Sequence, residues 1–279
     1  MSNIKVIERL GKSPGKTIVL LAGVHGNETC GVEAFKELIP NLSISSGKVI
    51  FIYANIEAIK QNKRQIDYNL NRCFLKNQPE EIKKTLESKT AKEIMPYLEK
   101  ADLILDIHAS FTEGSMPFLI CDEQQLEKSK IFDVDIISYN WDSFEPGSTE
   151  YYMNLQGKPG FCIECGFLGN KESNEKAKQA ILNFLAFARC INREVKEREN
   201  QRIIKIKSIY KNKDKFTLSR IFKDFEKLSE KTLIGLDGRE KIFADKGDII
   251  LFARNSQGLE EECFLLAEER LLNEGNWIS

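Results

Sequence analysis

The sequence predicts an α/β fold with a mainly parallel central sheet and helices on both faces, followed by a small β-rich subdomain. Two observations carry this prediction. Short apolar runs, typical of strands buried on both faces, alternate with segments of helical spacing up to about residue 200. Beyond that point the pattern changes to period-two alternation, which is typical of half-buried strands. We therefore expect an α/β domain over residues 1–200 and a β-rich subdomain over residues 201–279.

The first part of the chain contains several apolar runs with the length of strands. They cover residues 16–22, 48–54, 102–107, 116–121, 134–139 and 161–165. Intervening segments have apolar residues at the spacing of an amphipathic helix. One of these segments begins at Glu28, and the other two cover residues 79–100 and 171–196. Residues 60–75 are polar and are expected to form a loop. Because helices separate most of the strands, we expect parallel pairing.

The second part is predicted from three short patterns. Residues 203–209 alternate apolar and polar side chains, residues 236–239 read as a turn, and residues 248–253 form an apolar run. Lysines between residues 205 and 215 interleave with apolar residues, and we interpret them as the solvated face of a strand. This tract therefore gives no reason to expect a nucleic-acid site.

The composition is that of a globular protein without strong net charge. The chain has 279 residues, with 41 Lys and Arg against 42 Asp and Glu, so its net charge of −1 gives no general attraction to nucleic acids or membrane surfaces. The N-terminus lacks the apolar region of a signal peptide, and no apolar run approaches the roughly 20 residues of a membrane span. Seven scattered cysteines show no disulfide pattern, which favours a cytoplasmic location.

His25 and His108 are the only two histidines of the chain, and each follows a predicted strand. In open α/β sheets, ligands bind at the carboxyl ends of the strands, so a site is expected here. Glu28 lies three residues beyond His25 and can reach the same point. Two imidazoles and one carboxylate make a three-ligand zinc site with a fourth position open. From spacing alone, two unrelated loop histidines remain an equally good interpretation.

Four short motifs occur in an order that resembles a known family. They are Gly23-Val-His25-Gly-Asn-Glu28, Asn69-Leu-Asn71-Arg72, Asp106-Ile-His108 and Ile163-Glu164-Cys-Gly166. Together they are similar to the succinylglutamate desuccinylase/aspartoacylase family, relatives of the zinc carboxypeptidases, over roughly residues 16–195. The resemblance implies that His25, Glu28 and His108 hold one Zn²⁺ per chain, which polarises the scissile carbonyl and acidifies water.

The resemblance also implies roles for polar residues near the metal. Glu164 corresponds to the family's catalytic carboxylate, which takes a proton from water and passes it to the leaving amine. Arg64 corresponds to the residue that stabilises the oxyanion, and Asn71 and Arg72 to those that bind the substrate carboxylate. Asp106 either orients a ligand histidine or makes an ordinary structural hydrogen bond. For Glu164, the alternative is an edge strand that turns the carboxylate to solvent.

Three features depart from the family pattern. Asn69 stands where aspartoacylases usually have Asp, which weakens the assignment of the contacts that support this loop. No Lys or Arg occurs from residue 131 to 157, where an arginine for the aspartate side chain is expected. N-acetylaspartate is therefore a poor candidate, although Lys158 is a partial substitute. After Tyr152 the only tyrosine is Tyr210, so a substrate-binding tyrosine from the tail is not expected. If the acid-rich residues 131–157 line the mouth of the site, they favour a neutral or cationic substrate tail.

These features predict a zinc-dependent amidohydrolase that removes the acyl group from an N-acyl amino acid or a similar small amide. A zinc carboxypeptidase that acts on a peptide C-terminus is an alternative, since Asn71 and Arg72 would bind either carboxylate. A non-catalytic zinc protein that binds a carboxylate ligand is a second alternative, but it would need neither Glu164 nor Arg64. The expected partner is a small N-acyl amino acid or short peptide, not a nucleic acid or a membrane, and the oligomeric state is left open.

Overall fold

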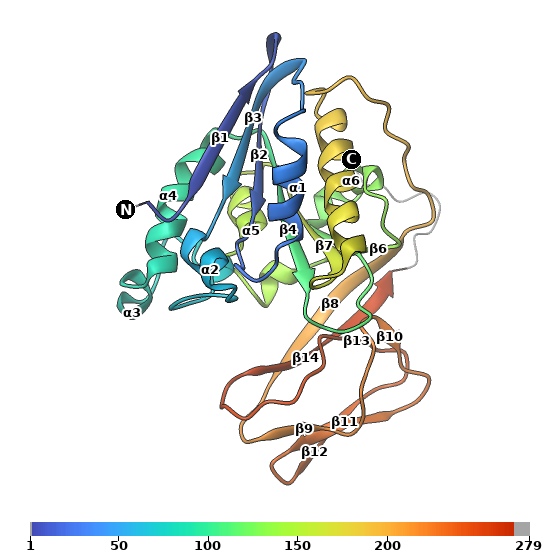
Figure 1. The fold of residues 1–279 in the computed structure, drawn as a ribbon. Helices are drawn as coiled ribbons and strands as arrows, with labels where there is room; N and C mark the ends of the chain where they lie inside the picture. Colours follow the sequence, from blue (N-terminus) through green and yellow to red (C-terminus); the bar gives the residue numbers. More distant parts are fainter. Residues whose placement is uncertain (1, 271–279) are drawn as a thin grey trace.

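The computed structural model describes residues 2–270 and has one large mixed sheet crossed by helices on both faces (Figure 1). Met1 and the last nine residues of the predicted second subdomain lie outside the described part. In spatial order the strands of the main sheet are β1 (Lys5–Leu10), β3 (Ser46–Tyr53), β2 (Ser13–Ala22), β4 (Leu103–Ser110), β7 (Gly160–Phe167), β5 (Phe118–Cys121), β6 (Ile136–Tyr139), β8 (Arg202–Lys211), β14 (Glu262–Arg270), β13 (Ile249–Leu251) and β10 (Glu226–Lys227).

The centre of this sheet is parallel, as predicted. β3, β2, β4 and β7 pair in parallel, and β5, β6 and β8 form a second parallel group that meets β7 in antiparallel orientation. Every residue of β4 is buried, which explains why the strand is apolar apart from Asp106, His108 and Ser110. Ala22 at the end of β2 lies opposite Ile107 of β4, so the turn after β2 reaches the level of His108. This register brings the two histidines to one edge of the sheet.

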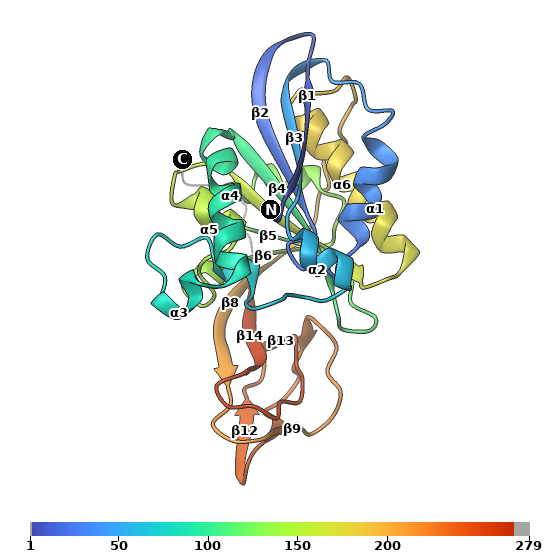
Figure 2. The ribbon, with the colours of Figure 1, turned by 60° about the vertical axis from the view of Figure 1, so that its left-hand side comes forward.

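Helices cover the two faces of the sheet (Figures 1 and 2). α1 (Cys30–Leu38) and α6 (Lys171–Phe187) pack on one face around Phe35 and Phe184, whereas α4 (Leu86–Lys100) and α5 (Thr149–Asn154) pack on the other around Leu98 and Met153. Short elements connect them: α2 (Ile56–Gln61), α3 (Glu80–Lys83), η1 (Leu70–Arg72), η2 (Glu123–Gln125), η3 (Lys128–Ile131) and η4 (Trp141–Ser143). Within residues 2–270, no helix combines the length and the apolar character needed to cross a membrane.

Two element boundaries near the histidines differ from the prediction. α1 begins at Cys30 rather than at Glu28, because Glu28 belongs to the turn that follows β2. β4 continues to Ser110, so His108 lies inside a strand rather than after one. The polar ring of His108 can remain in this buried strand because Glu28 and Asp106 pair with its two nitrogens.

Two longer predicted helices are also shorter in the structure. The segment 79–100 is interrupted at Thr85, whose extended backbone (φ −64°, ψ 157°) lets its side chain cap the first turn of α4. The segment 171–196 is helical only to Phe187, because Arg189 has a left-handed φ of 62° that a helix cannot continue.

The C-terminal part extends the main sheet and adds a small second one. β8 pairs in parallel with β6, and β14, β13 and β10 follow in antiparallel order. The second sheet contains β12 (Glu240–Ala244), β11 (Thr232–Asp237) and β9 (Phe216–Leu218), at the lower end of Figure 1. Leu251 and Leu265 share an apolar cluster with Phe118 of the first part. The main sheet thus crosses the predicted boundary at residue 200, which itself stays a prediction.

Candidate metal centre and substrate cavity

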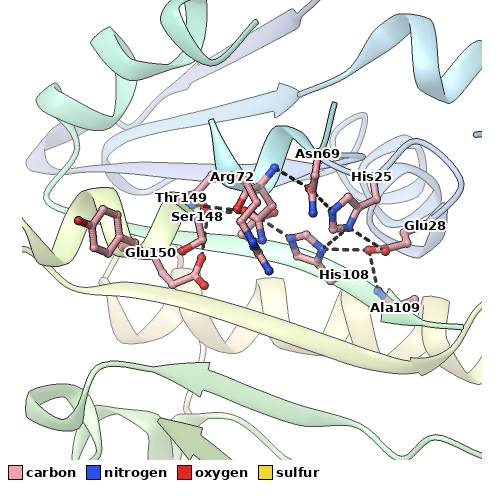
Figure 3. Close-up of polar contacts among 12 residues, drawn as sticks. His25, Glu28, Asn69, Arg72, His108, Ala109, Ser148, Thr149 and Glu150 are labelled. Carbon is pink, nitrogen blue, oxygen red and sulfur yellow. Dashed lines mark hydrogen bonds and ion pairs between the residues drawn. The ribbon is translucent and has the colours of Figure 1, made fainter. Parts of the chain in front are cut away.

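Three side chains converge at the edge of the sheet where β2 and β4 lie side by side (Figure 3). Nδ1 of His25 lies 2.8 Å from one oxygen of Glu28, and Nδ1 of His108 lies 2.9 Å from the other. The two Nδ1 atoms are 3.2 Å apart. All three side chains are almost fully buried. They are the one cluster of metal-ligating side chains found within residues 2–270.

Glycines allow the turn after β2 to present His25 and Glu28. Gly23 has a φ of +72°, a conformation that other residues adopt only with strain. Gly26 passes so close to α2 that an added Cβ would lie 2.2 Å from the backbone carbon of Ala58. The backbone of this turn therefore requires both glycines of the first motif. The turn that they allow brings Glu28 to the same point as His25.

The outer nitrogens of both histidines lie near side-chain oxygens, but only that of His25 is in hydrogen-bonding geometry. Nε2 of His25 lies 2.9 Å from Oδ1 of Asn69, and Nε2 of His108 lies 3.1 Å from Oδ2 of Asp106. Thr149 donates its hydroxyl proton to the same Asp106 oxygen at 2.6 Å. When each Nε2–H donates outward, both Nδ1 lone pairs face the Glu28 carboxylate. Three electron-pair donors then point at one spot, an arrangement that favours a cation there.

The spacing and charge of this cluster suit zinc. Four ligands at about 2.0–2.1 Å in a tetrahedron have donor atoms roughly 3.3 Å apart. Here the two Nδ1 atoms are 3.2 Å apart, and each lies 2.8–2.9 Å from a different oxygen of Glu28, so one ion can be reached from all three side chains. Burial raises the pKa of the Glu28 carboxyl, but the two histidines outweigh it and hold that pKa well below its ordinary value. Burial lowers the pKa of His108, yet Asp106 and Glu28 are among the groups that raise it well above the ordinary value. The cluster therefore attracts positive charge.

Glu164 stands beside this cluster on the neighbouring strand. β7 pairs with β4 so that Glu164 lies opposite His108, and its Oε2 atom is buried without a hydrogen-bond partner among the described residues. Burial, followed by the nearby Glu28 carboxylate, raises the pKa of Glu164 to about 8. The alternative of an edge strand is wrong, because β7 lies between β4 and β5. A carboxyl group held in this way can accept a proton near neutral pH.

The loop that precedes and includes η1 brings the two predicted arginines to the cluster. Nη1 of Arg64 lies 2.8 Å from the Glu28 carboxylate. Asn69 accepts a hydrogen bond from the backbone N–H of Asn71 at 2.9 Å while it contacts His25, so it still supports the loop in the place of the expected Asp. Nη2 of Arg72 lies 2.5 Å from a carboxylate oxygen of Glu145. Through Asn69, this loop thus brings the second motif into contact with the histidine cluster.

Glu87 was not predicted, yet it holds this loop in place. Its carboxylate is fully buried and accepts hydrogen bonds from three consecutive backbone N–H groups, those of Ile66, Asp67 and Tyr68, at 2.7–3.1 Å. The side-chain amide of Asn55 adds a fourth contact at 3.3 Å. One sequence signal could have found it: Glu87 occupies the same helical stripe as the buried apolar residues Ala91, Ile94 and Leu98.

The cluster opens into a cavity of about 290 Å³ that spans both parts of the chain. Its walls include the metal-ligating residues, Glu164 and all of the predicted substrate-binding residues. The acid-rich segment 131–157 does reach this cavity, through residues that include Glu145 and Glu150. The C-terminal part contributes walls that the sequence did not predict, namely Phe252, Arg254, Glu262 and Leu265.

Comparison with known sequences identifies the same family as the four motifs. Residues 14–188, more than half of the chain, match the model described as the succinylglutamate desuccinylase/aspartoacylase catalytic domain. A probable aspartoacylase of Nostoc sp. is 26% identical over 193 residues, which are 63% of this chain and 65% of that protein. A succinylglutamate desuccinylase of Shewanella woodyi is 45% identical over 64 residues, 22% of this chain and 19% of that protein. The chain thus matches less than two thirds of the length of these relatives.

Solved structures show the same fold. A succinylglutamate desuccinylase from Vibrio cholerae superposes with a TM-score of 0.80 at 16% identity, covering 95% of this chain and 85% of that one. Its counterpart from Vibrio parahaemolyticus gives a TM-score of 0.76 at 18% identity, with 95% and 86% covered. At this identity the likeness concerns the fold alone. It confirms the predicted fold class and includes the C-terminal part.

Proposed function

Because the chain belongs to the succinylglutamate desuccinylase/aspartoacylase family, we propose that it is a zinc-dependent amidohydrolase that deacylates a small N-acyl amino acid. Water adds to the acyl carbon, the C–N bond breaks, and the products are a carboxylate and a free amine. The observation that supports this proposal is the meeting of His25, Glu28 and His108 with the partnerless Glu164 in one cavity. A mere binding site would not need a buried carboxyl group beside the metal ligands.

Different side chains of the cavity are assigned different roles in the reaction. Zinc held by His25, Glu28 and His108 would supply a Lewis acid that polarises a carbonyl group and acidifies water. Glu164, with its pKa raised to about 8, takes the proton from the attacking water and delivers it to the leaving nitrogen. Arg64, whose guanidinium contacts the carboxylate of Glu28, stabilises the negative oxygen of the tetrahedral intermediate.

The carboxylate of the substrate is assigned to Asn71 and Arg72, which line the same cavity. A guanidinium can pair with a carboxylate through two parallel hydrogen bonds. The cavity volume of about 290 Å³ lies at the lower end of the range of about 300–1,000 Å³ for ligand pockets, which favours a small amide over a long peptide. This is the reason for preferring a deacylase to a carboxypeptidase.

The test combines metal analysis with a substrate panel. The purified protein is expected to carry about one zinc per chain and to hydrolyse some N-acyl amino acids faster than dipeptides and tripeptides. His108→Ala should lose most of the zinc and the activity, whereas Glu33→Gln, which alters an exposed carboxylate of α1, should keep both. Undiminished zinc in His108→Ala would refute the ligand set. Hydrolysis of the peptides alone would identify a carboxypeptidase, and zinc binding without turnover of any substrate would indicate a binding protein.

A further inference from the structure

The cavity has an acidic end that the proposed chemistry does not use. Glu145, Glu150 and Glu262 all line it, the first two from the segment before and within α5 and the third from β14. They surround Arg72, the residue assigned to the substrate carboxylate. Figure 3 shows Glu150 and Glu28 at opposite ends of the row of polar residues in the site.

Both arginines near this end are already paired. Arg72 forms an ion pair with Glu145 at 2.5 Å, and Glu145 is in turn hydrogen-bonded to the carboxyl group of Glu262. Arg254 donates from Nε to the backbone oxygen of Glu262 at 2.9 Å and lies over the ring of Phe111, 5.4 Å from its centroid. With Arg72 assigned to the α-carboxylate, an acidic side chain would find three glutamates here and, as a cation, only Arg254, which already lies 3.9 Å from the carboxylate of Glu262.

Glu150 is the carboxylate that lacks a counter-charge. Its residue is only 5% exposed, and it forms no ion pair with a Lys or Arg of the described chain. The one neighbouring hydroxyl, that of Thr149 at 3.3 Å, has a single proton and donates it to Asp106 at the shorter distance of 2.6 Å. Glu150 is therefore a buried, cavity-lining carboxylate whose hydrogen bonds come from its own backbone N–H and, at a longer distance, from Thr149, and which has no Lys or Arg of the described chain as a counter-charge.

The pKa values agree with unsatisfied negative charge at this end. Burial, with Asp142 and Asp106 next in importance, raises the pKa of Glu150 to about 7. Burial and the contact with Glu145 raise the pKa of Glu262 to about 7 as well. A bound cation would stabilise the ionised form of both groups and so bind favourably near neutral pH.

The location of Glu150 shows which side of the substrate it meets. The backbone N–H of the adjacent Thr149 donates to Oδ1 of Asn71 at 3.4 Å, so Glu150 lies next to the residues assigned to the substrate carboxylate. The carboxylate belongs to the amino acid, not to the acyl group. Glu150 therefore faces the amino-acid side chain.

We propose that the amino acid released by this enzyme is a diamino acid, whose side-chain ammonium binds to Glu150 at the acidic end of the cavity, which Glu262 also lines. This inference rests on the proposed deacylase function and adds the charge of the side chain to it. The acyl amide is hydrolysed at the α-nitrogen near the metal, while the distal ammonium supplies the counter-charge that the buried Glu150 lacks. Charge complementarity of this kind strengthens the binding of a cation and weakens the binding of an anion at the same place.

The test compares three substrates that differ in one group. Nα-acetylornithine has a distal ammonium, N-acetylnorleucine has a methyl group in its place, and N-acetylglutamate has a carboxylate. We expect kcat/KM for the ornithine substrate to exceed that for the norleucine substrate by about tenfold or more, and the glutamate substrate to be the slowest. Glu150→Gln should bring the ornithine-to-norleucine ratio to within about threefold of one. Glu240→Gln removes an exposed carboxylate outside the cavity and should keep the ratio of the parent protein.

A second variant and a binding measurement keep the test decisive. Glu262→Gln, from a different strand, removes charge but can still donate to Glu145, and it should lower the same ratio if Glu150→Gln does not fold. Calorimetric titration with free ornithine and free norleucine measures recognition of the products without turnover. If none of the acetyl amino acids is hydrolysed but ornithine still binds better than norleucine, the deacylase proposal fails and the cation site stands. Equal kcat/KM values, a preference for the glutamate substrate, or equal binding of the two products would overturn the inference.

Discussion

The metal-binding end of the cavity and its acidic end are built in different ways. His25 follows β2, while His108 and Glu164 lie opposite each other on β4 and β7, so the strand ladder fixes their separation. At the acidic end, Arg72 lies on a loop, and Glu145 and Glu262 reach it from segments far apart in the sequence. The comparison suggests that the reaction depends on the rigid sheet edge, whereas substrate choice depends on segments that can change without altering the sheet.

The structure of the acidic end of the cavity consequently depends on a few individual side chains. Glu87 alone supplies acceptors for three consecutive N–H groups of the loop that precedes Arg72. No strand ladder replaces these contacts if they are lost. The four predictions that follow test this difference, from the largest expected effect to the smallest.

Glu164→Gln should have the largest effect, on turnover alone. Glutamine is nearly the same size but cannot accept the proton of water, so kcat should fall by roughly 10²–10⁴. Replacing a buried carboxyl group that has one oxygen without a partner costs little stability, and the zinc content should stay at the parent level because none of the proposed ligands is changed. The measurements are steady-state kinetics and metal analysis. A kcat within about threefold of the parent, or loss of zinc together with activity, would contradict the assigned role of Glu164.

Glu87→Gln should show that the loop relies on one carboxylate. The amide group turns an N–H₂ towards backbone N–H donors, which leaves at least one of them without an acceptor at a cost of about 1–3 kcal/mol. We expect this loss in the free energy of unfolding by urea, with a raised KM and unchanged zinc content. Glu81→Gln, an exposed residue of α3, is the matched control and should unfold like the parent. If both variants have the parent stability and KM, the loop is held by other contacts.

The same difference explains what the sequence could predict. The strand runs predicted the fold class, and the His-x-x-Glu spacing with the place of His108 indicated a possible meeting of these three residues at the sheet edge, whereas the role of Glu164 beside them came from the resemblance of the four motifs to the family. The extent of β4 was missed, because burial of a His beside Asp106 is decided by a tertiary contact. The walls from Arg254 and Glu262 were missed for a related reason: their approach to the cavity depends on the packing of β14 against the first part.

Arg72→Lys tests whether the loop arginine binds the substrate carboxylate. Lysine keeps the charge and the attraction to Glu145 but loses the planar pair of N–H donors. KM for the best N-acyl amino acid should rise by about tenfold, which corresponds to roughly 1.4 kcal/mol, whereas KM for its methyl ester should change little. Arg239→Lys on the exposed turn between β11 and β12 is the control. Equal losses with acid and ester would mean that Arg72 supports the structure instead.

Ser115→Ala should have the smallest effect, and it tests how the C-terminal part is joined to the cavity. Ser115 donates to the carboxylate of Asp224 at 3.1 Å, and the same carboxylate accepts the backbone N–H of Phe252, a cavity residue, at 2.7 Å. Loss of one such hydrogen bond should reduce the free energy of unfolding by about 0.5–1.5 kcal/mol. Ser229→Ala, at an exposed position between β10 and β11, should unfold like the parent.

The pH dependence of this loss identifies its origin. Burial raises the pKa of Asp224, and the Ser115 hydroxyl opposes that rise because it donates to the ionised form. Removing the hydroxyl therefore raises the folded-state pKa further. The difference in stability between parent and Ser115→Ala should be full above that pKa, where Asp224 is ionised, and should shrink as the pH falls through it. Urea unfolding at several pH values measures this difference. A difference that is independent of pH would mean that Ser115 acts through packing of the loop rather than through Asp224.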